Sequence, residues 1–362
     1  MSIVGHEISD LQPAFPDRDI SEIEKILDDN RLGLRRCYES FGYLGIRQCE
    51  SKFFNVKSDG SRSTGREKFE AENFCRIHLY GGSTTLGENV PDSETISAQL
   101  EKLLCSKHNV NCLVSNYGAG NHTSLHSTLR LLFHCLSGNA PDIAIFLNGY
   151  NDLFYSGGGE DGIANLFDQL LLYSQDTSKR DVKVSDLILQ IPSTVRLDAE
   201  ERVDFSRESA SKRFENVVQR YGTALVIQNF IEKTFLTRVL RFIEPSVAVC
   251  CRPDQNVLPK LFDFGSRRKI ANHLYRELGS IGLKPVFGKN VISLISFGQD
   301  KLKFPLFIDG VHFTPQMNQI LAVKICEHIK PKWIKPKAMR EPRAVKRSEV
   351  SELTNPDNYP LF

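Results

Sequence analysis

The sequence lacks the features by which membrane-bound and secreted proteins are recognised. No run of about 18 apolar residues occurs in the 362-residue chain, and residues 1–7 contain no basic group followed by an apolar stretch. Its nine cysteines form no C-x-x-C pair, and an odd number leaves at least one thiol outside any disulfide pairing. We therefore expect a soluble cytoplasmic protein with reduced cysteines and no contact with a membrane.

An excess of charge of one sign is also missing. The 46 lysines and arginines nearly balance the 44 aspartates and glutamates, which leaves a formal net charge of +2. The overall charge therefore gives no reason to expect a nucleic acid or an acidic surface as the main partner. Only residues 330–362 are strongly basic, and their prolines and lack of periodicity predict a surface or disordered tail. Polyanion binding by this tail is the less favoured alternative.

Residues spaced to hold a metal or a phosphate group are lacking as well. His78, His122, His126 and His134 have no carboxylate or cysteine at ligand spacing. The glycines at 157–159 lack the lysine of a phosphate loop, so we interpret them as a flexible loop that could gate substrate entry. We expect no metal and no cofactor.

What the chain does contain is an alternation of short apolar segments with helical patterns. Segments that are rich in β-branched residues predict five buried strands, at 76–80, 112–117, 143–147, 247–251 and 291–295. Apolar residues recur at helical spacing in 96–104, 125–136, 163–170 and 206–241. The alternation predicts an α/β fold with three α/β/α layers around a doubly wound parallel five-stranded sheet.

This fold accounts for the middle of the chain only. We expect an irregular N-terminal extension at 1–71, the α/β domain at 72–329, and the basic tail at 330–362. A long helical insertion at about 155–245 separates the third predicted strand from the fourth, and it is a candidate cap or substrate wall.

Four polar segments are predicted to meet at one edge of the sheet: 79–85 (LYGGSTT), 116–121 (NYGAGN), 148–152 (NGYND) and 308–312 (IDGVH). The first three end an apolar run and the fourth opens a helical pattern. Together they supply a hydroxyl nucleophile, a histidine base, a carboxylate to orient it, and hydrogen-bond donors for an oxyanion. This set predicts a serine esterase.

Ser83 is the candidate nucleophile. It follows two glycines at the end of the first predicted strand, where the absence of Cβ atoms lets the backbone turn sharply and project the serine above the sheet. Taken alone, such a serine is more often a helix N-cap, and that alternative is set aside only because the other segments are present. Thr85 excludes the Gly-x-Ser-x-Gly elbow of α/β-hydrolases.

Asp309 and His312 lie three residues apart, just before Thr314 and Pro315, a typical N-cap and first helical residue. This places a carboxylate close enough to hold the imidazole in one tautomer, so that His312 could take the proton of Ser83. A turn aspartate beside a surface histidine is the alternative.

The order of the four segments resembles that of the SGNH (GDSL-type) hydrolase family over about residues 76–328. The resemblance implies a flavodoxin-like fold in which Ser83 is the nucleophile, Asp309 the orienting acid, and His312 the base. It implies that the Asn151 amide and the backbone N–H of Ser83 bind the oxyanion, although Asn151 alone could be a turn former.

Two positions depart from the usual family pattern. Gly82 stands where the family often has Asp, a change that the family's Gly-Gly-Ser-Thr variants share. In the second block, gap-free alignment puts Asn121 rather than Gly120 at the glycine that donates to the oxyanion. Asn tolerates positive φ better than most residues, so both remain candidates.

The resemblance implies hydrolysis of an O-acyl ester of a carbohydrate or small metabolite through an acyl-enzyme. An acyltransferase with the same nucleophile is one alternative, and the choice depends on water exclusion. A non-catalytic binding module on the same fold is disfavoured because Ser83, Asn151, Asp309 and His312 are all present. A nucleotide-binding domain is disfavoured because no Gly-x-Gly-x-x-Gly follows the first strand.

Overall fold

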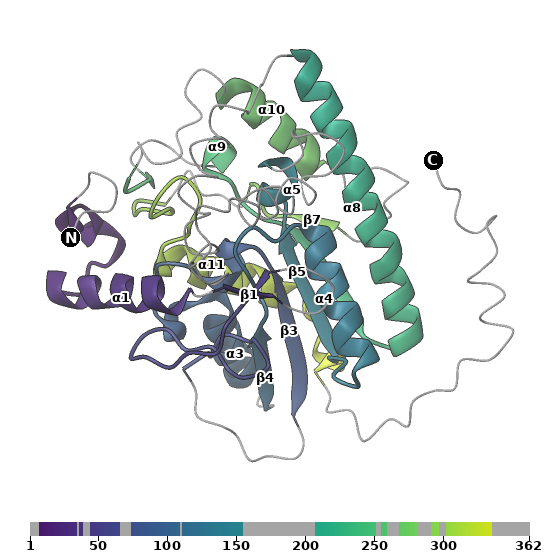
Figure 1. Ribbon diagram of the computed structural model, residues 1–362, viewed down its shortest axis with the longest axis horizontal. Helices are drawn as coiled ribbons and strands as arrows, with labels where there is room; N and C mark the ends of the chain where they lie inside the picture. Colours follow the sequence, from purple (N-terminus) through teal and green to yellow (C-terminus); the bar gives the residue numbers. More distant parts are fainter. Residues whose placement is uncertain are drawn as a thin grey trace, which may run out of the picture.

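A parallel five-stranded sheet forms the centre of the molecule (Figure 1). The computed structural model describes residues 7–34, 36–38, 44–65, 74–108, 111–154, 207–250, 255–258, 268–280, 291–296 and 302–334. Within them, the sheet has the order β4-β3-β5-β6-β7, with all neighbours parallel. The strands are β3 (Cys75–Gly81), β4 (Cys112–Asn116), β5 (Ile143–Asn148), β6 (Arg238–Ile243) and β7 (Val291–Ser293). Numbered along the chain this is the flavodoxin-like order 2-1-3-4-5, which confirms the predicted fold class.

Helices cover both faces of the sheet (Figure 1). Helices α3 (Ile96–His108) and α11 (Pro315–Glu327) contact each other and share one hydrophobic cluster with the sheet. Helices α4 (Ser124–Leu136) and α8 (Arg207–Phe235) pack together on the other face. After the N-terminal extension, the other helical elements described are α2 (Ser83–Leu86), η2 (Asp92–Glu94), α5 (Tyr150–Phe154), α9 (Val247–Cys250), α10 (Arg268–Gly279) and η10 (Pro331–Trp333).

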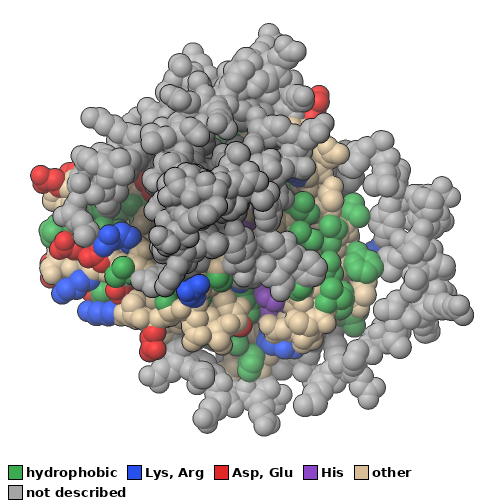
Figure 2. Space-filling model, viewed as in Figure 1, with side chains coloured by type: hydrophobic (Ala, Val, Ile, Leu, Met, Phe, Trp, Pro, Cys, Tyr) green, Lys and Arg blue, Asp and Glu red, His purple; other side chains and the backbone are tan. Residues whose placement is uncertain are grey.

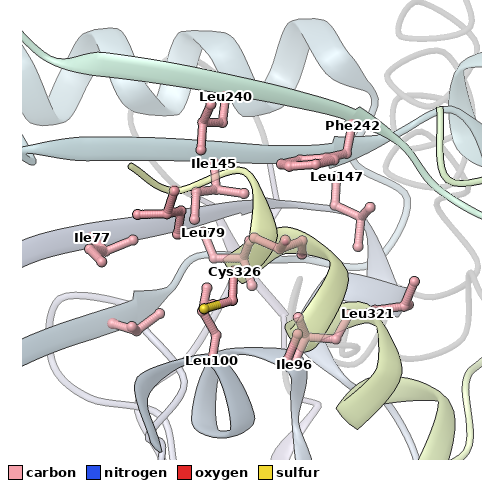
Figure 3. Close-up of a cluster of buried hydrophobic side chains, with 14 of the residues drawn as sticks. Ile77, Leu79, Ile96, Leu100, Ile145, Leu147, Leu240, Phe242, Leu321 and Cys326 are labelled. Atoms are coloured by element: carbon pink, nitrogen blue, oxygen red, sulfur yellow. The ribbon is translucent and has the colours of Figure 1, made fainter. Parts of the chain in front are cut away.

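The core lies between the sheet and these helices. On β3, Ile77 and Leu79 face the cluster that α3 and α11 complete, as Figure 3 shows, whereas Tyr80 joins the cluster on the α4 side. Successive strand residues point to opposite faces, and here both faces are buried. This is why the strands appear in the sequence as nearly continuous apolar runs.

The fourth strand is not where the sequence predicts it. The prediction of a strand at 247–251 is wrong, since helix α9 occupies 247–250. The fourth strand of the sheet is β6, which ends at Ile243. Helix α8 ends at Phe235, so the helix expected up to 241 and the insertion expected up to about 245 both end too late. Arg241 accounts for the error. In the sequence, a basic residue within an apolar segment favours an exposed helix face over a buried strand. In the structure the Arg241 guanidinium is buried and donates to Gln228 (2.7 Å) and Asn229 (2.8 Å) of α8.

The N-terminal extension is more regular than expected. It contains η1 (Ile8–Ala14), α1 (Ile20–Gly33) and an antiparallel pair of strands, β1 (Arg36–Tyr38) and β2 (Leu44–Ile46). The Asp19 side chain caps α1 by accepting from the backbone N–H of Glu22 (2.8 Å). An aspartate at this position is a typical helix start, which the composition of the segment alone does not reveal. Both helices pack against residues of the α/β domain, including Val90 and Ile308.

The surface view separates two kinds of side chain. Figure 2 shows acidic and basic side chains mixed at the left, where Figure 1 places α1, and hydrophobic side chains at the right, where it places α4 and α8. Leu136, Val226 and Phe230 are among the exposed apolar residues. No helix in the described ranges is long and apolar enough to cross a bilayer.

Candidate active site

Ser83 begins α2 directly beyond the carboxyl end of β3. Gly82 is the N-cap of this helix, and a Cβ atom at Gly81 would overlap Thr85 and the Leu147 carbonyl of the neighbouring strand. Gly81 is therefore needed for close packing against β5. Because the chain reverses its direction of winding between β3 and β5, this edge is the switch point at which doubly wound folds form their sites.

Asn151 lies on α5, just beyond the end of β5, and its amide points toward the Ser83 segment. Its Nδ2 donates to the His122 carbonyl (3.0 Å). A Cβ atom built at Gly82 would lie 2.5 Å from the same nitrogen, so the amide sits against the backbone that leads into Ser83. The structure thus places the Asn151 amide against Gly82, the residue that precedes Ser83.

The second block forms a turn at the same edge. The Ala119 N–H donates to the Gly81 carbonyl (3.1 Å), and the His122 N–H closes the turn on the Ala119 carbonyl (3.2 Å). Gly120 and Asn121 occupy the two central positions, and Asn121 has φ of 66°. Asn121 therefore adopts the positive φ that asparagine tolerates better than most residues. Both residues remain candidates for the backbone donor.

Asp309 and His312 form a buried pair. Asp309 Oδ2 lies 2.7 Å from His312 Nδ1, and Oδ1 accepts from the backbone N–H groups of Val311 and His312, each at 2.7 Å. Burial acts to raise the pKa of Asp309, but the charge on His312 and the hydrogen bonds from His312 and Val311 outweigh it and hold that pKa below its ordinary value. The carboxylate therefore stays ionised at neutral pH and fixes the orientation of the ring.

Glu88 faces the other nitrogen of the same ring. Its Oε2 lies 3.4 Å from His312 Nε2. The Glu88 N–H donates to the Ser83 carbonyl (3.2 Å), so Nε2 faces the turn that closes the Ser83 helix. No pattern in the sequence marks Glu88, because this contact joins segments more than 200 residues apart.

Arg62 holds that turn in place from the N-terminal extension. Its fully buried guanidinium donates to Asp92 (2.8 Å) and to the carbonyls of Leu86 (3.0 Å) and Val90 (2.6 Å). These bonds enclose the turn on which Glu88 sits. Arg62 therefore links the N-terminal extension to the turn that follows the Ser83 helix.

Glu244 is a second buried carboxylate that the sequence reasoning missed. It follows β6, accepts from Thr84 Oγ1 (2.5 Å) and from the Tyr150 N–H (2.9 Å), and is 2% exposed. Burial is the largest cause that raises the pKa of Glu244, to about 7, against the hydrogen bonds from Thr84 and Tyr150. A correct placement of β6 would have marked Glu244, because it follows the carboxyl end of that strand.

Other polar candidates have structural contacts. Asp152 accepts from the backbone N–H and hydroxyl of Ser124 at the start of α4 (3.0 and 2.6 Å). His78 and His134 both contact the Tyr80 hydroxyl (3.0 and 2.7 Å). In the part of the chain that the structure describes, no group of three or more His, Cys, Asp or Glu side chains is arranged to hold a metal. The glycine loop at 157–159 and the tail beyond 334 lie outside that part.

Comparisons with known proteins give structural neighbours only. No family model and no curated protein matches the sequence. An acetyl xylan esterase structure has a TM-score of 0.40 and 15% identity, covering 70% of this chain and 100% of that one. A catalytic mutant of an acetylxylan esterase from Geobacillus stearothermophilus has a TM-score of 0.39 and 13% identity, covering 75% and 100%. A lipase/acylhydrolase from Enterococcus faecalis has a TM-score of 0.35 and 16% identity, covering 73% and 98%. These values are too low to bear on function.

Proposed function

We propose that the protein is a serine esterase of the SGNH type that hydrolyses an O-acyl ester of a carbohydrate or small metabolite. The observation that carries the proposal is the 2.7 Å contact between Asp309 Oδ2 and His312 Nδ1. It fixes the tautomer in which Nδ1 carries the proton and Nε2 the lone pair, the form that a general base needs. Glu88 Oε2 lies 3.4 Å from Nε2, where its charge would stabilise the imidazolium that forms once Nε2 has accepted a proton.

The first half-reaction forms an acyl-enzyme. His312 Nε2 takes the proton of Ser83 Oγ as the oxygen attacks the ester carbonyl. The negative charge of the tetrahedral intermediate is stabilised by the Ser83 N–H, the N–H of Gly120 or Asn121, and Asn151 Nδ2. His312 then gives its proton to the departing alkoxide, and the alcohol leaves.

Water completes the cycle. His312 Nε2 accepts a proton from a water molecule while the water oxygen attacks the acyl carbon. The same hydrogen-bond donors stabilise the oxyanion of this second tetrahedral intermediate. Collapse of the second tetrahedral intermediate breaks the bond to Ser83 Oγ, which recovers its proton from His312 and releases the acid. Asp309 remains an anion throughout and stabilises the imidazolium that forms in each half.

The test is covalent labelling with a fluorophosphonate, followed by turnover of a panel of acetyl and longer acyl esters. The parent should react at one residue, and Ser83→Ala should abolish both labelling and turnover without changing the circular dichroism spectrum. Ser106→Ala, on exposed α3 surface, is the matched control and should behave as the parent. Labelling that survives Ser83→Ala would contradict the assignment.

A further inference from the structure

The side chain of Glu244 lies between the starts of two short helices. One carboxylate oxygen accepts from the hydroxyl of Thr84, the residue after Ser83, and the other accepts from the backbone N–H of Tyr150, the residue before Asn151. A single side chain therefore contacts the segment of the nucleophile and the segment of the amide donor at once.

The two helices need such a connection. Helix α2 has four residues and α5 has five, and helices this short have little stability of their own. Their positions depend on what their ends contact. Glu244 is itself fixed at both backbone groups, because its N–H donates to the Asn148 carbonyl (3.0 Å) and its carbonyl accepts from the Tyr275 hydroxyl (2.9 Å).

Burial makes this carboxylate costly to keep. Glu244 is 2% exposed, and removing a carboxylate from water is unfavourable unless hydrogen bonds or charges compensate. Both of its oxygens accept a hydrogen bond, so the same two contacts that join α2 and α5 offset part of this cost. The charges that act on it from the surrounding elements are those of Asp152 and His312.

We propose that Glu244 is a positioning residue that sets the separation between Ser83 and the Asn151 amide by holding α2 and α5 together. This inference rests on the proposed function, since the separation matters only where both groups act on one carbonyl. A misplacement of about 1 Å in such an arrangement can cost about 10²-fold in rate.

The chain offers a matched control in Glu101. This glutamate is 1% exposed and also accepts one threonine hydroxyl, from Thr64 (3.1 Å), and one backbone N–H, from Val114 (2.8 Å). It joins α3 to β4 rather than α2 to α5. Removing either carboxylate should lower stability, but only the loss of Glu244 should lower turnover per folded molecule.

The experiment measures kcat and KM for an acetyl ester, and folded fraction by circular dichroism. Glu244→Ala should lower kcat by about 10- to 100-fold with little change in KM. Glu244→Gln should recover most of it, because the amide oxygen accepts from Tyr150 while the NH₂ group donates to Thr84. Thr84→Val removes one contact at nearly constant volume and should cause a smaller loss, which also covers the case in which Glu244→Ala does not fold. Glu101→Ala should keep the parental kcat.

A double-mutant cycle shows through which group Glu244 acts. If Glu244 positions the amide donor, Glu244→Ala should lower kcat clearly less in the Asn151→Ala background than in the parent. Full additivity, or a Glu244→Ala variant that behaves as Glu101→Ala, would overturn the positioning role alone. A parent that neither reacts with a fluorophosphonate nor hydrolyses any ester would overturn the proposed function instead.

Discussion

Replacing Gly82 by alanine should inactivate the enzyme without unfolding it. The added Cβ would lie 2.5 Å from Asn151 Nδ2, whereas ordinary contacts begin at 3.4 Å. The amide must therefore retreat by about 0.9 Å. An effective oxyanion donor lies about 2.7–3.1 Å from the charge, so a displacement of this size removes Asn151 from that range. The expected loss in kcat is that of one missing donor, about 10²–10³.

The same substitution should change stability little. Gly82 has φ of −82° and ψ of −158°, which any residue can adopt, so no backbone strain arises. The lost bond from Asn151 to the His122 carbonyl costs about 0.5–1.5 kcal/mol. Alanine lowers the entropy of the unfolded chain and returns about 0.4–1 kcal/mol. The two nearly cancel, and the melting temperature should stay close to that of the parent.

The assay compares kcat for an acetyl ester and thermal melting in four proteins: the parent, Gly82→Ala, Asn151→Ala and the double variant. Once Asn151 is truncated, the new methyl group has nothing to displace, so Gly82→Ala should cost almost nothing in that background. A Gly82→Ala enzyme that keeps more than about a tenth of parental turnover would refute the reasoning, given the usual effect of one donor. So would an equal loss in both backgrounds.

Two further results are expected from the buried carboxylates. Asp309→Asn should lower kcat by about 10³–10⁴, because an amide no longer fixes the tautomer of His312 or balances its charge, and a steady-state assay checks this. Because burial raises the pKa of Glu244 from 4.5 to about 7, the folded protein binds more protons than the unfolded chain between these values. The unfolding free energy of the parent should therefore fall as pH rises through this window, by at most about 3 kcal/mol relative to Glu244→Gln. Urea titrations of both proteins at pH 5 and pH 8 measure it, and parallel curves would contradict the assigned burial.

Most of the sheet could be predicted because β3, β4 and β5 are buried along nearly their whole length. Strands β3, β4, β5 and β7 lie within a few residues of their predicted positions, since each appears as an apolar run that ends in polar or glycine residues. Strand β6 failed for a physical reason: Arg241 is buried inside the strand, where it donates hydrogen bonds to side chains of α8, and these contacts exist only in the folded chain.

The residues of the candidate site also differ in whether local sequence is enough to find them. Asp309 and His312 lie three residues apart, and glycines precede Ser83 at the end of a strand, so local sequence was enough to single them out. Glu244 and Thr84 are 160 positions apart, and no local pattern joins them. Side chains that support a site from distant segments depend on strand order and register, which must be known before they can be named.

The contacts of Arg62 affect how this protein can be shortened. A boundary drawn at residue 72 on composition would remove a guanidinium that donates to four groups beyond that boundary, at Asp92, Leu86, Gly87 and Val90. Several carbonyls of the turn beside Ser83 would then be left without their donor. We therefore expect the smallest active unit to begin before Arg62 and the extension to fold together with the α/β domain.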